Sequence, residues 1–303
     1  PMEEKQLVEN IAAFLEQNPF KTDQEKKEKW YVDMMPQLHQ HHLSKCSAYR
    51  NIWTHFNHPT KGRETDIQDA GQFRPLPVSL FKQHLLSSIA EDEIYKILAS
   101  SGTTGSTPSR VPLDQQTAEF QQRALANIMT SFLGSRRRPM LIIDHPQILN
   151  EKAQYSARAA GILGFSMYGS GRCFALDDNL NIDINRVQAF LERHQGKQIL
   201  VFGFTYLIWQ TLYLQLKKKE MSIDLSNAIL VHGGGWKKLK EQAVSEEMFR
   251  QGLYETCGLK HISNHYGMAE QTGGIYIECE QHHFHASLYS EIIIRNLQDF
   301  SIC

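Results

Sequence analysis

The run ILASSGTTGSTPSRVPLD, residues 97–114, decides how this chain of 303 residues is interpreted. It places Ser101, Thr103 and Thr104 around Gly102 and Gly105, directly after an apolar segment. Glycine permits positive φ and close approach to a ligand, and consecutive backbone N–H groups in such a turn bind anions. No Gly-Lys-Ser/Thr follows, so the run is not the lysine-bearing P-loop. From the run alone, two interpretations stay open: a mobile, hydroxyl-rich loop or a phosphate-binding loop.

Short apolar segments, each followed by a glycine-rich turn or a helical pattern, make up the chain beyond residue 100. RPMLIID, QILVFGF and NAILVHGGG have the composition of buried strands, and TYLIWQTLYLQLKKKE has the pattern of a helix. Strands that alternate with helices predict an α/β fold with a largely parallel sheet. The first fifty residues instead have helical spacing. We therefore predict an N-terminal helical region over residues 1–72 and an α/β domain over residues 73–303, with a last strand in SEIIIR.

The composition excludes several functional classes. The chain is 41% hydrophobic and 21% charged with a formal net charge of -1, so it lacks the basic surface of a nucleic-acid-binding protein. Its five cysteines are an odd number and widely spread, which favours free thiols in a reducing compartment. Residues 199–216 are long enough for a membrane span, but glycine, threonine and glutamine interrupt them and favour a core strand and helix. We expect a cytoplasmic protein without a membrane span.

Two further glycine-containing motifs follow predicted strands. In NAILVHGGGWKKL the strand ends at His232, three glycines follow, and Trp236 is expected to open a helix. Such glycines let a flat ligand lie against bare backbone, next to a positive helix N-terminus. In NHYGMAEQTGG, Tyr266 can cover a purine and Glu270 can hold Mg²⁺ through oxygen. Each motif alone is equally compatible with a tight structural turn.

Together, the three motifs resemble those of the adenylate-forming superfamily, whose phosphate loop reads Ser-Gly-Thr-Thr-Gly and whose later motif reads Tyr-Gly-x-x-Glu. They stand here at residues 101–105 and 266–270. Within that superfamily, the chain is similar to LuxE-type acyl-protein synthetases of the bacterial bioluminescence fatty-acid reductase, from about Phe73 to the end. The resemblance implies the superfamily's large N-terminal domain, with layered sheets and flanking helices. It also implies that the mobile C-terminal lid domain and the acceptor cysteine lie outside this chain.

The resemblance further implies a ligase that activates a fatty acid with ATP as an acyl-adenylate and passes the acyl group to a protein cysteine. The implied ATP-binding residues are Ser100, Ser101, Gly102, Thr103, Thr104, Gly105, Ser106, His232, Gly233, Gly234, Gly235, Trp236, Tyr266, Gly267, Met268 and Glu270. The implied catalytic residues are Glu270, as the Mg²⁺ ligand, with Thr103, Thr104 and Arg110, the last in place of the family's usual lysine. The implied acyl pocket comprises Phe204, Tyr206, Trp209 and His232.

Two other functions stay open. A ligase of the phenylacetate–coenzyme A type shares both motifs but transfers the acyl group to coenzyme A. A nucleotide-binding subunit that assembles with an acyl-reductase partner is the alternative from another class.

Two histidine-cysteine clusters allow different interpretations. CEQHHFHA brings Cys279, His282 and His285 close enough in sequence for Zn²⁺, although a hairpin with surface or site-lining histidines has the same pattern. HQHHLSKC places His42 and Cys46 one helical turn apart. A solvated helix face is the simpler interpretation of that second cluster.

Overall fold

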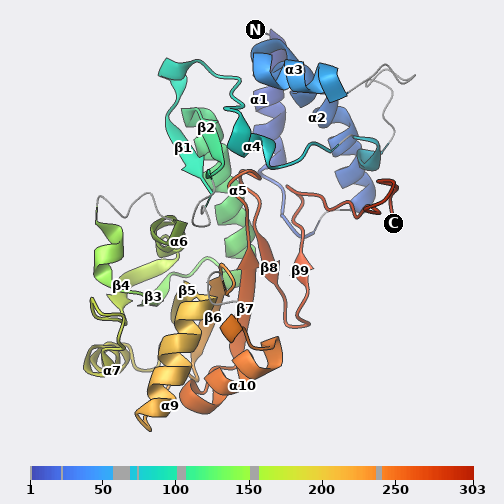
Figure 1. Ribbon diagram of the computed structural model, residues 1–303. Coiled ribbons are helices and arrows are strands. Elements are labelled where there is room, and N and C mark those ends of the chain that lie inside the picture. Colours follow the sequence, from blue (N-terminus) through green and yellow to red (C-terminus); the bar gives the residue numbers. More distant parts are fainter. Residues whose placement is uncertain are drawn as a thin grey trace. The chain divides into compact units, whose positions relative to one another are not determined.

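The computed structural model describes residues 2–21, 23–56, 69–73, 75–100, 107–150, 157–236 and 241–303. The chain divides into two compact units (Figure 1). Unit 1 comprises Pro1–Gly134, Gly267–Ile275 and Ala286–Cys303, and unit 2 comprises Ser135–Tyr266 and Tyr276–His285. Each unit therefore combines segments that are distant in the sequence.

Unit 2 is built on a seven-stranded sheet with the order β4-β3-β5-β6-β7-β8-β9. The strands are β3 (Arg138–Ile143), β4 (Gly169–Phe174), β5 (Ile199–Phe204), β6 (Ala228–Gly233), β7 (His261–Tyr266), β8 (Tyr276–Glu278) and β9 (Phe284–His285). The strands from β4 to β7 are parallel, and β8 and β9 add antiparallel pairs at one side. The α/β fold and the three strands predicted from sequence are confirmed.

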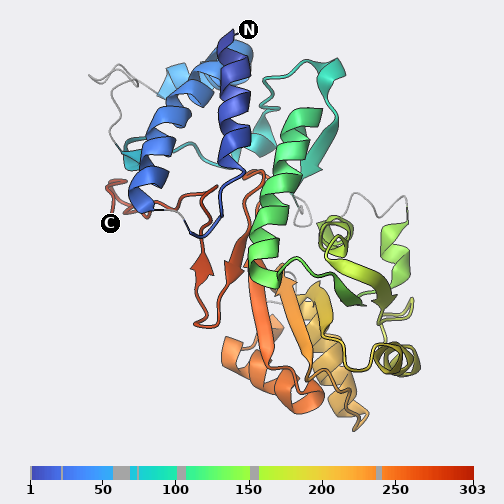
Figure 2. The same cartoon turned by 180° about the vertical axis from the view of Figure 1, so that it is seen from behind.

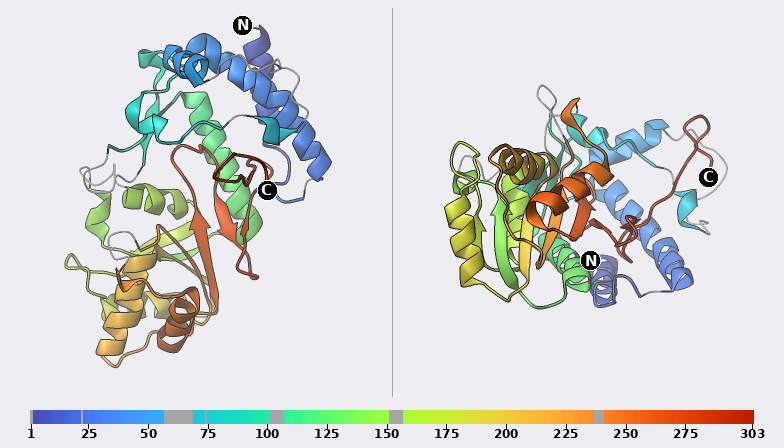
Figure 3. Two further views of the ribbon diagram at one scale, coloured as in Figure 1. Left: turned by 45° about the vertical axis from the view of Figure 1, so that its right-hand side comes forward. Right: turned by 90° about the horizontal axis from the view of Figure 1, so that it is seen from below.

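The central strands are apolar because helices cover both faces of the sheet. All six residues of β5 are buried, as expected for a parallel strand without a solvent-facing side. On one face, Phe202 stacks on Phe165 of α6 (Ala157–Ser166), with 4.3 Å between ring centroids. On the other face, His232 contacts Phe249 of α10 (Glu246–Cys257) at 4.8 Å. Unit 2 also contains η4 (Pro146–Leu149) and α7 (Ile184–Arg193) (Figure 3).

The helix predicted after β5 is present, with an unpredicted change of winding in its middle. It begins as α8 (Thr205–Ile208), continues as the π-helical segment η5 (Trp209–Gln215) and ends as α9 (Leu216–Lys218). Within η5, Trp209 stacks on Tyr213 with 4.0 Å between ring centroids. A Cβ atom on Gly252 of α10 would lie 2.8 Å from the Tyr213 ring. Glycine at this position therefore permits the close packing of α10 against the aromatic face of η5.

Unit 1 contains the predicted N-terminal helices, a hairpin and one long helix (Figure 2). Its elements are α1 (Met2–Phe14), α2 (Gln24–Lys45), α3 (Ser47–Phe56), η2 (Ala70–Gln72), α4 (Leu80–Gln83), η3 (Glu91–Glu93), β1 (Lys96–Ala99), β2 (Arg110–Leu113) and α5 (Gln115–Leu133). The strands β1 and β2 pair antiparallel. Asp114 begins α5 by accepting a hydrogen bond from the Thr117 amide, the usual role of an N-cap aspartate.

The segment Ala286–Cys303 belongs to unit 1 and contacts its N-terminal part. The Leu288 amide donates to the Pro19 carbonyl at 2.7 Å, and the Tyr289 hydroxyl donates to the Gln17 carbonyl at 2.9 Å. Glu291 forms a 3.0 Å ion pair with Lys27 of α2, whose side chain is 9% exposed. The strand predicted in SEIIIR is wrong. Residues 292–294 form no strand, because this segment finds no sheet partner beyond an isolated bridge between Arg295 and Ile302.

Two other expectations can be compared with the described residues. All five cysteines are free. No helix in the described ranges is both long enough and apolar enough to cross a bilayer.

An ion-pair network fixes α10 to the side of the sheet where the antiparallel strands join. Arg250 donates to Glu278 Oε2 at 2.7 Å and to the Ile262 carbonyl at 2.6 Å. The same Glu278 oxygen accepts the Asn264 amide at 2.8 Å. The Glu278 side chain is only 5% exposed, whereas Glu246, the other carboxylate paired with Arg250, is 42% exposed.

We predict that Glu278→Gln lowers the free energy of unfolding by about 3 kcal/mol, because it leaves Arg250 without its buried counter-charge. The matched change Glu246→Gln, on the exposed carboxylate of the same network, costs under about 1 kcal/mol. Urea denaturation followed by circular dichroism measures both. Equal losses for the two variants would show that burial of the Glu278 pair does not matter.

Candidate functional site

The carboxyl ends of the parallel strands in unit 2 bring together the end of the predicted strand QILVFGF and two of the three predicted motifs, HGGGW and NHYGMAEQTGG. In the sheet register, Phe204 of β5 pairs with Gly233 of β6, and Gly233 pairs with His265 of β7. The segments that follow, which begin at Thr205, Gly234 and Gly267, therefore leave the sheet at one edge. In parallel α/β sheets, ligands bind at this edge.

Hydrogen bonds at this edge define the protonation of His232. The Thr205 hydroxyl lies 2.9 Å from His232 Nδ1 and 3.1 Å from the Gly233 carbonyl oxygen. A hydroxyl has one proton, and a carbonyl can only accept, so Thr205 donates to Gly233 and accepts from His232 Nδ1–H. His232 is 0% exposed, and its Nε2 atom has no hydrogen-bond partner in the described structure. His232 is therefore a neutral imidazole at this edge, and its Nε2 atom is a hydrogen-bond acceptor without a partner among the described residues.

Glycine is required at the three positions of HGGGW for two different physical reasons. A Cβ atom on Gly233 would lie 2.5 Å from the His265 ring, so only glycine fits beside that side chain. Gly234 and Gly235 have φ values of 76° and 58°, in the left-handed region that glycine adopts without strain. Trp236 follows in a bend, and the helix expected to begin there falls mainly on residues 237–240, outside the described structure.

Tyr266 ends β7 with an exposed side chain. It is 53% exposed, and its ring lies 6.2 Å from that of Tyr276. An exposed aromatic face at a strand end is compatible with the predicted contact to a purine, which stays a prediction. Gly267, Met268 and Glu270 come after it and belong to unit 1.

The four residues predicted to form an acyl pocket lie in three environments. Phe204 and Trp209 are 7% and 5% exposed, and they pack on different elements. Phe204 faces α6, where a Cβ atom on Gly161 would lie 3.3 Å from its ring, whereas Trp209 contacts Phe249 of α10. His232 shares the Phe249 contact, so the structure brings Trp209 and His232 together but not Phe204.

A charged pair at the end of β3 was missed by sequence reasoning. Asp144 is 1% exposed and accepts two hydrogen bonds from Arg158, at 2.6 and 2.9 Å. Arg158 also donates to the Tyr206 hydroxyl at 3.4 Å, which positions the fourth predicted acyl-pocket residue. An aspartate directly after the strand RPMLII was the only available signal. Nothing in the sequence identified Arg158 as its partner.

In unit 1, hydrogen bonds between Ser100 and Ser109 close the base of the predicted phosphate loop. The Ser100 amide donates to the Ser109 carbonyl at 3.1 Å, and the Ser109 amide donates to the Ser100 hydroxyl at 2.9 Å. Arg110 follows as the exposed first residue of β2. Ser101, Gly102, Thr103, Thr104, Gly105 and Ser106 lie outside the described residues. The hairpin thus supplies a fixed base for this loop.

Glu270 lies in a turn of unit 1 and is partly exposed. In this turn the Gln271 amide donates to the Met268 carbonyl at 3.2 Å. Nowhere in the described ranges do three or more His, Cys, Asp or Glu side chains form a group that could hold a metal. A lone carboxylate fits Mg²⁺ only if phosphates and water supply the other ligands, which is how Mg²⁺ binds in nucleotide sites.

The same finding corrects the zinc site considered for Cys279, His282 and His285, which these residues do not form. His282 Nδ1 instead lies 3.4 Å from Glu278 Oε1, and Cys279 Sγ accepts the Gln281 amide at 3.4 Å.

His42 and Cys46 form no metal group either. The interpretation as a solvated helix face is wrong for Cys46, which is 4% exposed. The turn between α2 and α3 buries its side chain, and its sulfur accepts the Tyr49 amide at 3.3 Å.

Comparison with known families decides the affiliation. The model of the family described as "Acyl-protein synthetase, LuxE" matches residues 2–302. The chain belongs to the LuxE acyl-protein synthetase family. A curated relative of this LuxE-family chain is the long-chain-fatty-acid–luciferin-component ligase of Vibrio harveyi, which is 24% identical over 198 residues. That alignment covers 64% of the chain and 51% of the relative.

Solved structures agree on the fold of this LuxE-family chain. An open conformation of 2-hydroxyisobutyryl-CoA ligase, in complex with 2-HIB-AMP and CoA, matches with a TM-score of 0.57 at 12% identity. A second complex of that ligase, in the thioesterification state, matches with a TM-score of 0.56 at 14% identity. These matches cover 85% and 88% of the chain but 54% of each ligase chain. The chain spans about half the length of the relatives it matches.

Burial of two neutral histidines predicts a pH dependence of stability. Desolvation, with smaller effects of His265 and Arg250, lowers the pKa of His232 to about 3. Desolvation also lowers the pKa of His265 to about 4, although its Nδ1–H bond to the His232 carbonyl, at 2.8 Å, opposes the shift. Both folded-state values lie below the unfolded value near 6.5, so the neutral forms stabilise the protein above that pH.

We predict that this stability is lost as the pH falls from about 6.5 towards 4, by about 2 kcal/mol per histidine at pH 5. The measurement is urea unfolding at pH 7.5, 6 and 5. His265→Gln should flatten the pH dependence, and His261→Gln, at an exposed position of the same strand, should not. A pH dependence that is unchanged by His265→Gln would contradict the assignment.

Proposed function

We propose that this chain activates a fatty acid with ATP and serves the transfer of its acyl group to a protein cysteine thiol. The observation that carries the proposal is the match of the acyl-protein synthetase family over residues 2–302. The strand-end arrangement of Thr205, His232 and Gly233 supports it, because nucleotides bind at this edge in parallel α/β sheets. The proposed reaction is that of an AMP-forming ligase.

The first step joins two anions. A carboxylate oxygen of the fatty acid attacks the α-phosphorus of ATP, and the bond from that phosphorus to the bridging oxygen breaks to release pyrophosphate. Positioning and neutralisation of charge supply most of the catalysis in such a reaction. In the proposal, the loop at residues 100–106 and Arg110 hold the phosphates. Glu270 would hold Mg²⁺, which when bound would supply positive charge to offset that of the leaving pyrophosphate.

The second step consumes the acyl-adenylate. A cysteine thiolate attacks the acyl carbonyl carbon, the bond to the AMP oxygen breaks, and AMP leaves with its phosphate. In the proposal, residues 232–236 and Tyr266 contact the adenosine part, and Tyr206, Trp209 and His232 lie towards the acyl part. A fatty-acid substrate, an acyl-reductase partner and a cytoplasmic location belong to the same proposal.

A binding experiment separates this function from its nearest alternative. We predict that a non-hydrolysable dodecanoyl-adenylate analogue at about 100 times its Kd stabilises the chain by about 2.7 kcal/mol, which raises Tm by about 5 °C. The phenylacetyl analogue at equal concentration serves as the comparison. A larger shift with the phenylacetyl compound would favour a coenzyme A ligase. No shift with either compound would count against nucleotide activation by this chain.

A single substitution tests the role of Glu270. We predict that Glu270→Gln lowers dodecanoate-dependent ATP–pyrophosphate exchange at least about 100-fold, because the amide no longer neutralises Mg²⁺. Tm stays unchanged, since the side chain is partly exposed in a turn. Glu280→Gln, at an exposed position, is the matched control and retains full exchange. Wild-type exchange by Glu270→Gln would remove Glu270 from the mechanism.

A further inference from the structure

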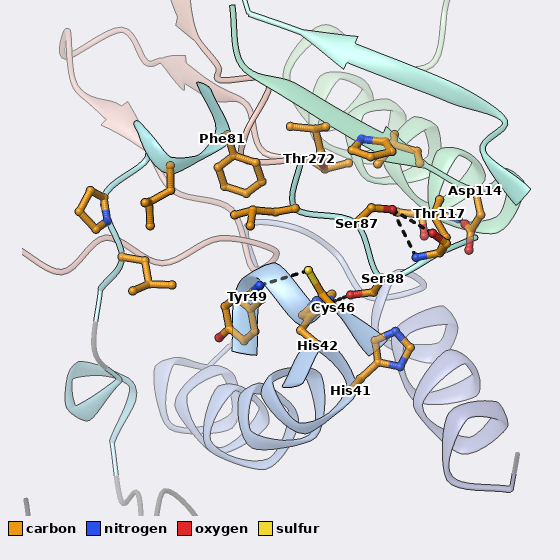
Figure 4. A pocket seen from close by; sticks show the side chains of 18 residues that line it. His41, His42, Cys46, Tyr49, Phe81, Ser87, Ser88, Asp114, Thr117 and Thr272 are labelled. Atoms are coloured by element: carbon orange, nitrogen blue, oxygen red, sulfur yellow. Dashed lines mark hydrogen bonds between the residues drawn. The ribbon is translucent and has the colours of Figure 1, made fainter. Parts of the chain in front are cut away.

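Unit 1 contains a pocket of about 400 Å³ whose lining includes none of the residues assigned to ATP. Its walls come from the end of α2, Cys46, the start of α3, the segment 76–89, β2 and the start of α5 (Figure 4). Thr272 also reaches it from the segment 267–275. All of these segments belong to unit 1, so the pocket is a feature of one compact body.

Much of the wall is apolar and well packed. Leu80, Val111 and Leu113 are 8%, 8% and 4% exposed, and Phe81 packs against the cluster formed by the last two. Figure 4 shows Phe81 on one side of the pocket, opposite Tyr49 and Cys46. Because these side chains are packed against other residues, they do not collapse into the pocket. The apolar wall therefore favours an apolar occupant.

Three polar side chains in the wall, those of Ser87, Ser88 and Asp114, already have hydrogen-bond partners within the protein. The Ser88 hydroxyl is bonded to His42 Nδ1 at 2.7 Å, and Ser87 bonds to the backbone of Ile89. The Asp114 carboxylate accepts the Thr117 amide at 2.6 Å. Because these groups have partners, an occupant with many polar atoms would have to leave water without equivalent bonds.

The charge of the wall disfavours an anion. The described lining residues include the carboxylate of Asp114 but no lysine or arginine. The pKa of His42 is lowered to about 4 by desolvation and by the neighbouring His41 and His39, although the residue keeps contact with solvent. His42 is therefore neutral at pH 7. A carboxylate inside the pocket would meet the negative charge of Asp114, and the described lining offers it no lysine or arginine.

The size of the pocket limits the occupant. A cavity of about 150 Å³ holds benzene, which has six heavy atoms, so a pocket of about 400 Å³ holds about 16. An unbranched alkyl chain of about 12 to 15 carbons with one small polar group has this volume.

We propose that this unit 1 pocket binds an uncharged aliphatic molecule of about 12 to 16 heavy atoms, such as a fatty alcohol, aldehyde or ester chain. The site is independent of the ATP-dependent reaction proposed above. It differs from a fatty-acid substrate site because it selects against the carboxylate.

Cys46 provides the readout, since its sulfur lines the pocket and Cys303 is exposed elsewhere in the chain. Alkylation by N-ethylmaleimide is followed for each cysteine by peptide mass spectrometry, with 1-alkanols from hexanol to dodecanol as probes. We expect protection of Cys46 but not Cys303. The apparent Kd of the alkanol, obtained from the protection of Cys46, should fall about fourfold for each added methylene group, because each group buried in the pocket adds a similar free energy of binding. Decanoate at pH 8 should bind at least tenfold more weakly than 1-decanol.

A substitution that fills the pocket is compared with the same substitution at the adjacent residue outside the pocket. Leu86 lines the pocket, whereas Leu85 is 46% exposed and does not. Leu86→Trp should weaken 1-dodecanol at least tenfold, and Leu85→Trp should leave its affinity unchanged. Calorimetric titration of 1-dodecanol into the same variants gives the comparison independently of thiol reactivity. Absence of binding by either method, an equal effect of both variants, or equal affinity for decanoate and decanol would overturn the proposal.

Discussion

The absence of a side chain at Gly233 is the constraint on which the carboxyl edge of the sheet depends. A Cβ atom there would overlap the His265 ring at 2.5 Å, and the Gly233 carbonyl accepts the Thr205 hydroxyl. That hydroxyl in turn orients His232, whose carbonyl accepts the Nδ1–H group of His265. The missing methyl group therefore permits the register of β5, β6 and β7 that brings the end of β5 and the motifs after β6 and β7 to the same edge.

One buried polar atom at this edge, Nε2 of His232, lacks a hydrogen-bond partner among the described residues. An unpaired buried acceptor costs about 1–3 kcal/mol. A core assembled only for stability would replace such a group with an apolar side chain. The neutral imidazole is thus better explained by a ligand or water that donates to it.

The sequence allowed the fold to be predicted because its signals were local. Unbroken apolar runs identified β3, β5 and β6, and the three glycines marked the end of β6, which was predicted at His232 and lies at Gly233. Features that depend on tertiary contacts could not be predicted from the sequence. The pairing of Asp144 with Arg158, the π-helical winding around Trp209 and the burial of Cys46 each require a partner from elsewhere in the chain. The apolar residues 292–294 gave a false strand for the same reason, since composition does not show whether a neighbouring strand exists.

The return of the last residues to unit 1 has a consequence for synthesis of the protein. The chain passes between the two units after residues 134, 266, 275 and 285. The backbone carbonyls of Leu15 and Gln17, at the end of the first helix, receive the Tyr289 hydroxyl from a position more than 270 residues later. At about 5–20 residues per second, the ribosome needs tens of seconds to deliver that partner. During this interval the N-terminal helices lack the hydrogen bonds and the ion pair that residues 288–291 make with residues 15–27.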